Sequence, residues 1–272
     1  MWTLFEPIHA VTYFAQPARD AFEAANLRGF WRGYFAGRAA PLGPVGAAPV
    51  TALFFGFAPS MVTRALPDVW SRATPDESLT ARLAGARASL TPLFDGAGPV
   101  DEAAELLREA ASAVPTVGRA LGAANAALPW PDDALGILWH AATILREHRG
   151  DGHVAALLVA GLDGAETGVW RAAIDQRRVY LQPARGWTDD DWTAAASRLQ
   201  DRGWLDETGA ATKTALAARD EIEDITNRLA AAPWQHLGET RTARLHEVIH
   251  PLAHAARASL PDETPIGLPV LR

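Results

Sequence analysis

The feature that most constrains the fold is the alternation of alanine-rich stretches with proline and glycine along nearly the whole chain. Alanine has the highest helix propensity, and runs of β-branched residues are scarce. Proline and glycine between such stretches indicate helix ends, because both residues interrupt or terminate helices. A chain of 272 residues with 49% hydrophobic and 21% charged residues can bury a substantial core. The sequence therefore predicts a mainly α, globular protein built from many helices.

The absence of cysteine excludes disulfides and cysteine-ligated metal sites, and it agrees with a reducing compartment. The first residues show no basic region followed by an apolar region, so we expect no secretory signal. The most apolar stretch, residues 45–62, is interrupted by Pro49 and Pro59 and is short for a bilayer span. We therefore expect a cytoplasmic protein without a membrane partner.

Residues 129–133 hold two prolines and two aspartates and are the best candidate domain boundary. We divide the chain there into an N-terminal helical half, 1–130, and a C-terminal half, 131–272. In the N-terminal half, apolar periodicity predicts helices over 4–25, 30–38, 45–55 and 60–70, one from Pro75 after the Thr74 cap, and one or two within 101–127, broken near Pro115. In the C-terminal half, it predicts helices over 134–148, 154–160, 165–174, 190–202, 215–230 and 240–259, a strand around 179–181, a strand and tight turn within 203–212, and an extended tail.

Residues 199–222, LQDRGWLDETGAATKTALAARDEI, resemble the recognition helix, wing and return helix of MarR-like winged-helix regulators. The whole chain also resembles an actinobacterial family described only as helix–turn–helix-like. The stretches that carry this second resemblance are GYFAGRAAPLG (33–43), REHRGDGH (146–153) and RGWTDDDW (185–192). Together they imply a winged-helix or helix–turn–helix-like fold with a small β-wing in the C-terminal half. They imply no particular activity.

A weaker similarity exists between the two halves. TPDESLTARLAGARASL at 74–90 can be aligned with TDDDWTAAASRLQDRGWL at 188–205, and helix–turn–helix spacing precedes each stretch. One interpretation is an internal duplication, with two tandem halves of which the first has lost its wing. The other is chance similarity between alanine-rich helices.

A helix–turn–helix fold suggests a transcription factor, but the charges oppose this function. The expected recognition helix begins with Asp189, Asp190 and Asp191, and residues 186–212 carry six acidic residues against two arginines. Aspartates at a helix N-terminus stabilise the helix dipole, which explains their presence but provides no affinity for phosphate. The net charge of the chain is −7. We therefore expect that DNA is not the partner, and we keep a ligand-responsive regulator as the second alternative.

The stretch REHRGDGH falls at the predicted junction of two helices, where two glycines permit a turn or a close approach to a ligand. In a purely structural interpretation, Arg146 and Glu147 pair with neighbours and Asp151 caps the second helix. In a binding interpretation, Arg146, Glu147 and Arg149 line a pocket whose arginines hold a carboxylate or phosphate.

A third interpretation assigns chemistry to His148, Asp151 and His153. Their side chains offer nitrogen and oxygen ligands for a metal, or a histidine base for proton transfer. The spacing matches no established zinc signature, and the sequence identifies no partner for the histidines. In this interpretation the protein is an enzyme, whose reaction either uses a metal ion or does not. This enzyme is the first alternative to the binding protein.

An aromatic segment supplies the other half of the predicted pocket. Aromatic residues at 30–35 and 54–57 surround Tyr34 and Arg38. Most of these rings suit a hydrophobic core, and the remainder suit the flat wall of a ligand site, with Tyr34 and Arg38 as its polar groups.

The stretch HEVIHPLAH contains the pattern H-E-x-x-H at His246, Glu247 and His250, with His254 one helical turn further. Two histidines four residues apart on a helix can share a metal ion. Pro251 disturbs the helix directly after His250, and little chain follows to build a cleft. An exposed helix face is the simpler interpretation of this stretch.

The sequence contains no phosphate-binding loop, no G-x-G-x-x-G after a strand and no G-x-S-x-G, so cofactor and metal stay unknown. We expect a repurposed winged-helix protein that binds a small anionic or planar aromatic molecule in a pocket between the two halves. A monomer and a homodimer both fit the sequence.

Overall fold

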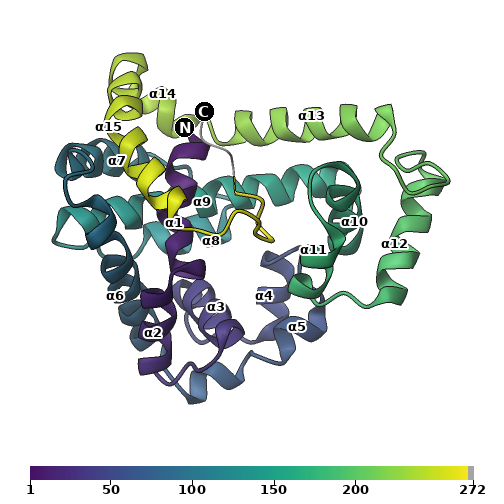
Figure 1. Cartoon of the computed structure of the whole chain (residues 1–272), viewed down its shortest axis with the longest axis horizontal. Coiled ribbons are helices and arrows are strands. Elements are labelled where there is room, and N and C mark those ends of the chain that lie inside the picture. Colours follow the sequence, from purple (N-terminus) through teal and green to yellow (C-terminus); the bar gives the residue numbers. More distant parts are fainter. Residues whose placement is uncertain (269–272) are drawn as a thin grey trace.

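The computed structural model describes residues 1–268, and helices make up most of this range (Figure 1). In the N-terminal half the elements are α1 (Trp2–Phe14), α2 (Gln16–Ala24), α3 (Phe30–Ala39), η1 (Ala40–Leu42), α4 (Ala47–Leu53), α5 (Pro59–Thr63), η2 (Asp68–Ser71), α6 (Pro75–Phe94), α7 (Val100–Ser112) and α8 (Ala120–Ala126). In the C-terminal half they are α9 (Ala134–Val159), α10 (Gly164–Ile174), α11 (Arg178–Arg185), α12 (Asp189–Asp201), α13 (Lys213–Leu229), α14 (Ala232–Leu237) and α15 (Glu239–Ala258).

Helix α9 is the longest element, and it runs through the middle of the molecule (Figure 1). It packs against α1, α6, α7 and α8 on one side and against α13 near its C-terminal end. Its first half contributes to a hydrophobic core shared with α1, α6, α7 and α15, and its last turns contribute to a second core with α10–α13. A third core lies among α3, α4 and α5. One continuous helix therefore connects two of the three cores.

The prediction of two helices over 134–148 and 154–160 is wrong, because α9 continues through both. Gly150 and Gly152 suggested a turn, but neither has a positive φ. At Gly152 a β-carbon would lie within 3.3 Å of three atoms of the Arg119 guanidinium, which crosses the helix at this point. Gly152 thus allows the Arg119 side chain to pass close to the backbone of α9, and it does not end this helix.

The strand predicted around 179–181 is also wrong, since these residues lie in α11. Local β-propensity is overruled by packing: Leu181 is buried, while Val179 and Tyr180 are exposed, as on an amphipathic helix. Gly186 ends the helix in the left-handed conformation, with φ of 77°.

The helix predicted over 4–25 is two helices. Ala15 between α1 and α2 is extended, with ψ of 141°. Pro17 cannot continue α1, because it has no N–H for the Tyr13 carbonyl and its ring would clash with that carbonyl.

Capping residues confirm the predicted starts of several helices. Thr74 and Glu77 form a capping box at α6, and Thr188 and Asp191 form one at α12. Thr212 caps α13 through the Ala215 N–H. The helices expected near 30–38, 101–127, 165–174 and 240–259 are present within a few residues.

The β-wing expected within 203–212 is reduced to one antiparallel bridge, between Leu205 and Ala211. The turn between these residues is stabilised by Asp206, whose carboxylate accepts hydrogen bonds from the N–H groups of Thr208 and Ala210. Residues 203–212 therefore form a compact loop between α12 and α13.

The division at 129–133 falls in the connection between α8 and α9. The largest core contains Leu107 from one side of this division and Trp139 and Leu252 from the other, so the two halves share buried side chains. The division into two domains and the internal duplication stay predictions. Within residues 1–268, no helix is both long and apolar enough to cross a membrane.

Helix α6 crosses α2 closely at Gly85, where an added β-carbon would lie 2.7 Å from the Ala18 Cα. We expect Gly85→Ala to lower the free energy of unfolding by roughly 1–3 kcal/mol, since backbone must move to accommodate the methyl group. Urea denaturation measures this change. Gly150→Ala is the control: its β-carbon has no neighbour closer than 3.9 Å. It should stabilise the protein by up to about 1 kcal/mol through helix propensity. Unchanged stability in Gly85→Ala would contradict the crossing geometry.

Candidate functional site

A buried carboxylate on α9 joins two arginines. Glu147 is 1% exposed, and its Oε1 accepts hydrogen bonds from Arg38 Nε and Arg146 Nη1, both at 2.9 Å. Its Oε2 accepts from Arg38 Nη2 at 3.1 Å, which makes the contact with Arg38 bidentate. Arg38 also donates to the Tyr34 hydroxyl at 3.2 Å. Four of the five residues predicted as ligand-binding are thus brought together, and they bind one another.

The electrostatics of this cluster are strongly coupled. Burial alone would raise the pKa of Glu147, but the charges of Arg146 and Arg38 hold it well below its usual range. Burial likewise opposes the charge of Arg38, and Glu147 more than compensates, so the pKa of Arg38 is raised. We call Tyr34, Arg38, Arg146 and Glu147 the ionic cluster.

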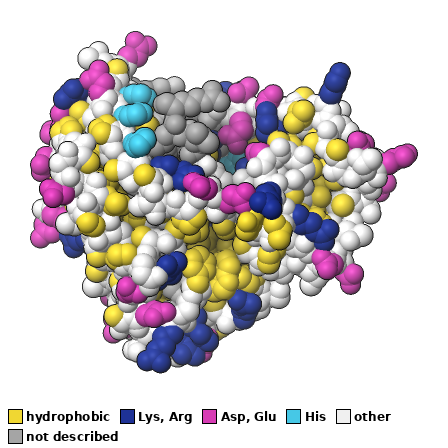
Figure 2. Space-filling view, viewed as in Figure 1, with side chains coloured by type: hydrophobic (Ala, Val, Ile, Leu, Met, Phe, Trp, Pro, Cys, Tyr) yellow, Lys and Arg dark blue, Asp and Glu magenta, His cyan; other side chains and the backbone are white. Residues whose placement is uncertain are grey.

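One stripe of α9 connects the ionic cluster to a cavity. Arg146, Gly150 and His153 are spaced i, i+4 and i+7 and therefore lie on the same face of the helix. All three border a cavity of about 220 Å³, which we call the apolar chamber. Gly150 leaves this space open because it has no side chain. In the space-filling view, hydrophobic side chains gather at the centre of this face, with charged side chains directly above them (Figure 2).

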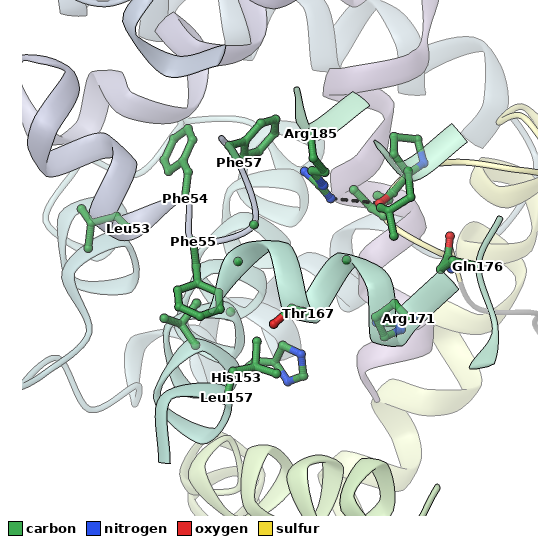
Figure 3. A pocket seen from close by; sticks show the side chains of 18 of the residues that line it. Leu53, Phe54, Phe55, Phe57, His153, Leu157, Thr167, Arg171, Gln176 and Arg185 are labelled. Carbon is green, nitrogen blue, oxygen red and sulfur yellow. Dashed lines mark hydrogen bonds between the residues drawn. The ribbon is translucent and has the colours of Figure 1, made fainter. Parts of the chain in front are cut away.

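Both halves of the chain build the apolar chamber. The N-terminal half contributes Leu53, Phe54, Phe55 and Phe57, which lie across the cavity from Thr167 and Arg171 of α10 (Figure 3). The C-terminal half adds Leu157 and Leu181, and the tail adds Pro265 and Ile266.

Two hydrogen bonds attach the loop between α4 and α5 to the region of α11. Trp187 Nε1 donates to the Gly56 carbonyl at 3.0 Å, and the Ala58 N–H donates to the Arg185 carbonyl at 2.8 Å. A β-carbon at Gly164 would collide with the Phe55 carbonyl, at 2.2 Å. The aromatic wall is therefore held in place by backbone contacts.

The charges that line the apolar chamber have one sign. Arg38, Arg146, Arg171 and Arg185 border it, whereas no Asp or Glu within residues 1–268 does so. Glu147, which does not line the chamber, neutralises Arg38 and Arg146. Asp175 pairs with Arg171 at 2.8 Å.

Arg185 differs from the other three arginines. It donates to the Pro265 carbonyl at 2.9 Å and its guanidinium lies 4.5 Å from the centre of the Phe57 ring, but it pairs with no carboxylate among the described residues. Burial lowers the pKa of Arg185, and the charges of Arg38 and Arg146 lower it further, although Tyr34 acts in the opposite direction. Within residues 1–268, Arg185 is thus the cation of the chamber that lacks an anionic partner.

A second, wider cavity of about 460 Å³ adjoins the first, and we call it the charged chamber. The two chambers share the lining residues Arg146, Gly150, His153, Arg171 and Ile266. Arg149, the fifth residue predicted as ligand-binding, borders only the charged chamber. It pairs with Glu223 at 2.7 Å and lies 4.5 Å from the Trp2 ring.

The three residues considered for catalysis lie on different sides of α9. Only His153 borders the chambers. Asp151 accepts a hydrogen bond from the Gly122 N–H at 2.9 Å, and burial raises its pKa to about 6. His148 is 1% exposed against α8, and burial together with Arg119 lowers its pKa to about 4. His148 and Asp151 therefore contact α8, while His153 faces the opposite region.

The histidines of α15 lie on an exposed part of the surface. His246 and His250 have ring centroids 6.0 Å apart, and Glu247 of the H-E-x-x-H pattern pairs with Arg244. Histidine side chains gather there in Figure 2. Within residues 1–268, no group of three or more His, Asp or Glu side chains is arranged to hold a metal ion.

Sequence reasoning missed Arg171, Arg185 and the histidine at position 9. His9 Nδ1 lies 2.9 Å from Thr143 Oγ1, and its Nε2 lies 2.9 Å from the Tyr13 hydroxyl, so it extends the polar core behind the ionic cluster. The i, i+4, i+7 spacing of Arg146, Gly150 and His153 was the available signal. It becomes visible only if the stretch is interpreted as one helix.

Helix α12, the predicted recognition helix, has its charges engaged within the protein. Arg198 pairs with Asp163 and Glu166 of the α10 start, and Arg202 donates to the Ala160 and Gly161 carbonyls. At the other end, Asp189 pairs with Arg178. Arg198 of α12 and Arg202 directly after it therefore attach this helix to the start of α10 and the end of α9.

We expect Glu147→Gln to lower the free energy of unfolding by roughly 3–5 kcal/mol, because it leaves Arg38 without a carboxylate and leaves Arg146 with Glu6 alone, whose Oε1 lies 3.7 Å from Arg146 Nε. Chemical denaturation measures the loss. The control is Glu247→Gln, which removes a carboxylate that is 66% exposed, and it should change stability little. Similar effects of the two substitutions would show that the ionic cluster is solvated.

Comparison with known proteins places the whole fold in one family. No curated protein and no solved structure was found to match the chain. A family model described as a helix-turn-helix family matches residues 1–261. This match spans both halves and agrees with the almost entirely helical structure. It includes the ionic cluster and all residues that line the two chambers except Pro265, Ile266 and Gly267. The chain therefore belongs to this helix-turn-helix family.

Proposed function

We propose that this protein uses its helix-turn-helix scaffold to bind a small anionic molecule with an apolar, flat body in the apolar chamber. The observation that carries the proposal is the lining of the chamber: four arginines and three phenylalanines, with no carboxylate from residues 1–268. Ligand sites typically combine mostly apolar walls with a few convergent polar groups. A guanidinium is suited to a carboxylate or phosphate because it donates two parallel hydrogen bonds.

Arg185 is the group that we assign to the anion. It faces the like charges of Arg38 and Arg146, which disfavour its cationic form, and it has no carboxylate partner among the described residues. An anion between these guanidiniums would relieve that repulsion. The aromatic wall formed by Phe54, Phe55 and Phe57 would contact the body of the ligand.

The proposal is tested by calorimetric titration with benzoate, phenylacetate, 2-naphthoate and phenyl phosphate. We expect at least one of them to bind, and we expect Arg185→Gln to weaken binding by tenfold or more. A hydrogen bond to a charged group contributes about 1.5–3 kcal/mol, which corresponds to this range. Arg178→Gln removes one positive charge from the exposed surface of the same helix, and it should leave affinity unchanged.

Gly150→Leu provides a second arm of this test. Leucine is a good helix former, and its side chain would enter the open space beside Gly150. Binding should be lost while the melting temperature is maintained. Failure of all four anions to bind, or equal affinities for wild type and Arg185→Gln, would refute the assignment.

DNA binding is the second candidate, because helix-turn-helix proteins commonly place a helix in the major groove. We infer a winged-helix arrangement with a minimal wing from the order α10, α11, α12, bridge and α13, and this inference supports the second candidate. The charges of α12 favour the small-molecule proposal instead, since Arg198 and Arg202 are engaged internally and three aspartates begin the helix. Phosphate neutralisation by Lys and Arg dominates affinity for DNA.

We expect no retardation of a random-sequence duplex in a gel-shift assay at low salt, with the protein at micromolar concentration. Non-specific binding by a DNA-binding protein is strongest under these conditions. A shift that weakens as salt increases would favour the regulator. Titration of the duplex with protein that is saturated with an anionic ligand would then distinguish a ligand-responsive regulator from a constitutive one.

An enzyme that uses His148, Asp151 and His153 together receives no support from their positions. His148 and Asp151 contact α8, and only His153 borders the chambers. The contacts of His153 are the subject of the inference that follows.

A further inference from the structure

His153 occupies the position where the two chambers meet. It borders both cavities, and its neighbours on the same face of α9 are Gly150 and Arg146. Its Nδ1 lies 3.0 Å from the hydroxyl oxygen of Thr226 on α13. In Figure 3 its ring lies beside Leu157 and near Thr167, on one side of the apolar chamber.

The hydrogen bonds of Thr226 determine which nitrogen of His153 carries the proton. A threonine hydroxyl has one hydrogen, and that of Thr226 is donated to the Ile222 carbonyl at 2.7 Å. The Thr226 oxygen can therefore only accept from His153, so Nδ1 carries the hydrogen. In a neutral imidazole, Nε2 is then an acceptor.

The ring is neutral under ordinary conditions. Burial, together with the charges of Arg149 and Arg171, lowers the pKa of His153 to about 4, although Glu223 acts in the opposite direction. Glu223 Oε1 lies 3.9 Å from Nδ1, on the side of the ring that faces α13. Nε2 accepts no hydrogen bond from any residue within 1–268, and it is not enclosed by protein atoms.

Thr167 on α10 offers a second acceptor of the same kind. Its hydroxyl hydrogen is donated to the Asp163 carbonyl at 2.8 Å, which leaves only oxygen lone pairs for the chamber that it borders. The chamber thus combines arginines, which can only donate, with two side chains that can only accept. Such a site holds a molecule that carries both an anion and a hydrogen-bond donor.

We propose that His153, held as the Nδ1–H form by Thr226, accepts a hydrogen bond from the ligand, and that the site therefore prefers aromatic carboxylates that carry a hydroxyl or N–H group. This inference depends on the proposed function. Thr226 is a positioning residue here, since it borders neither chamber. Sites that offer unpaired polar groups discriminate strongly against analogues that lack the complementary group.

The binding test compares matched pairs of probes by calorimetry. 3-(3-Hydroxyphenyl)propionate and 3-(4-hydroxyphenyl)propionate are compared with 3-phenylpropionate, and indole-3-acetate is compared with 1-methylindole-3-acetate. We expect the donor-bearing member of at least one pair to bind about 3- to 10-fold more tightly, the range for one neutral hydrogen bond. His153→Phe, which retains a ring but has no acceptor, should remove this preference.

The positioning role of Thr226 has its own readout. Nitrogen-15 NMR of the imidazole should show a protonated Nδ1 and an unprotonated Nε2 in the free protein at neutral pH, with the signals assigned from the His153→Phe spectrum. Thr226→Val keeps the side-chain shape but removes the acceptor, so the tautomer should change and the ligand preference should fall. Thr226→Ser restores the hydroxyl and should rescue both.

Three results would overturn this inference alone. They are equal binding within every pair by a wild type that binds carboxylates, an Nε2–H tautomer in the free protein, and a preference that survives His153→Phe. If none of the carboxylates binds to the wild type, the proposed function fails as well. The two failures are therefore distinguishable.

Discussion

The burial of the Glu147 carboxylate between Arg38 and Arg146 is the interaction on which the rest of the site depends. It joins α3 to the middle of α9, and these helices carry the polar edge of the apolar chamber. Three buried charges in contact are costly to desolvate, and they are tolerated only when their hydrogen bonds are well satisfied. Because the Glu147 carboxylate does not itself line the cavity, it fixes the guanidiniums of Arg38 and Arg146 while both arginines still border that cavity. A structural ion pair and part of the lining of a cavity are thus formed by the same side chains.

Local signals in the sequence were sufficient where the structure follows local rules. The capping residues Thr74 and Thr188 and the residues around Pro115 correctly indicated helix boundaries. The same rules failed at Gly150 and Gly152, because the role of these glycines is defined by elements distant in the sequence. Arg119 crosses at Gly152, and the cavity lies beside Gly150.

For the site, the sequence singled out Tyr34, Arg38, Arg146 and Glu147 by composition, and these residues do meet. It had no means of showing that they bind one another, since Arg38 and Glu147 are 109 residues apart. Arg171 and Arg185 went unnoticed for a related reason. Arg171 stands in no conspicuous polar run, and Arg185 begins the stretch RGWTDDDW, whose aspartates drew attention to a recognition helix. Only the packing of α10 and α11 against the aromatic loop directs the two arginines to the same space.

The face of α9 that carries Gly150 has a consequence for how such a protein can diversify. Glycine is the residue least suited to a helix interior apart from proline, yet here it leaves a cavity open. Any larger residue except proline would strengthen the helix at this position and reduce the volume of the apolar chamber. Helix stability and cavity volume are therefore opposed at one position, so a substitution that stabilises the fold also narrows the chamber.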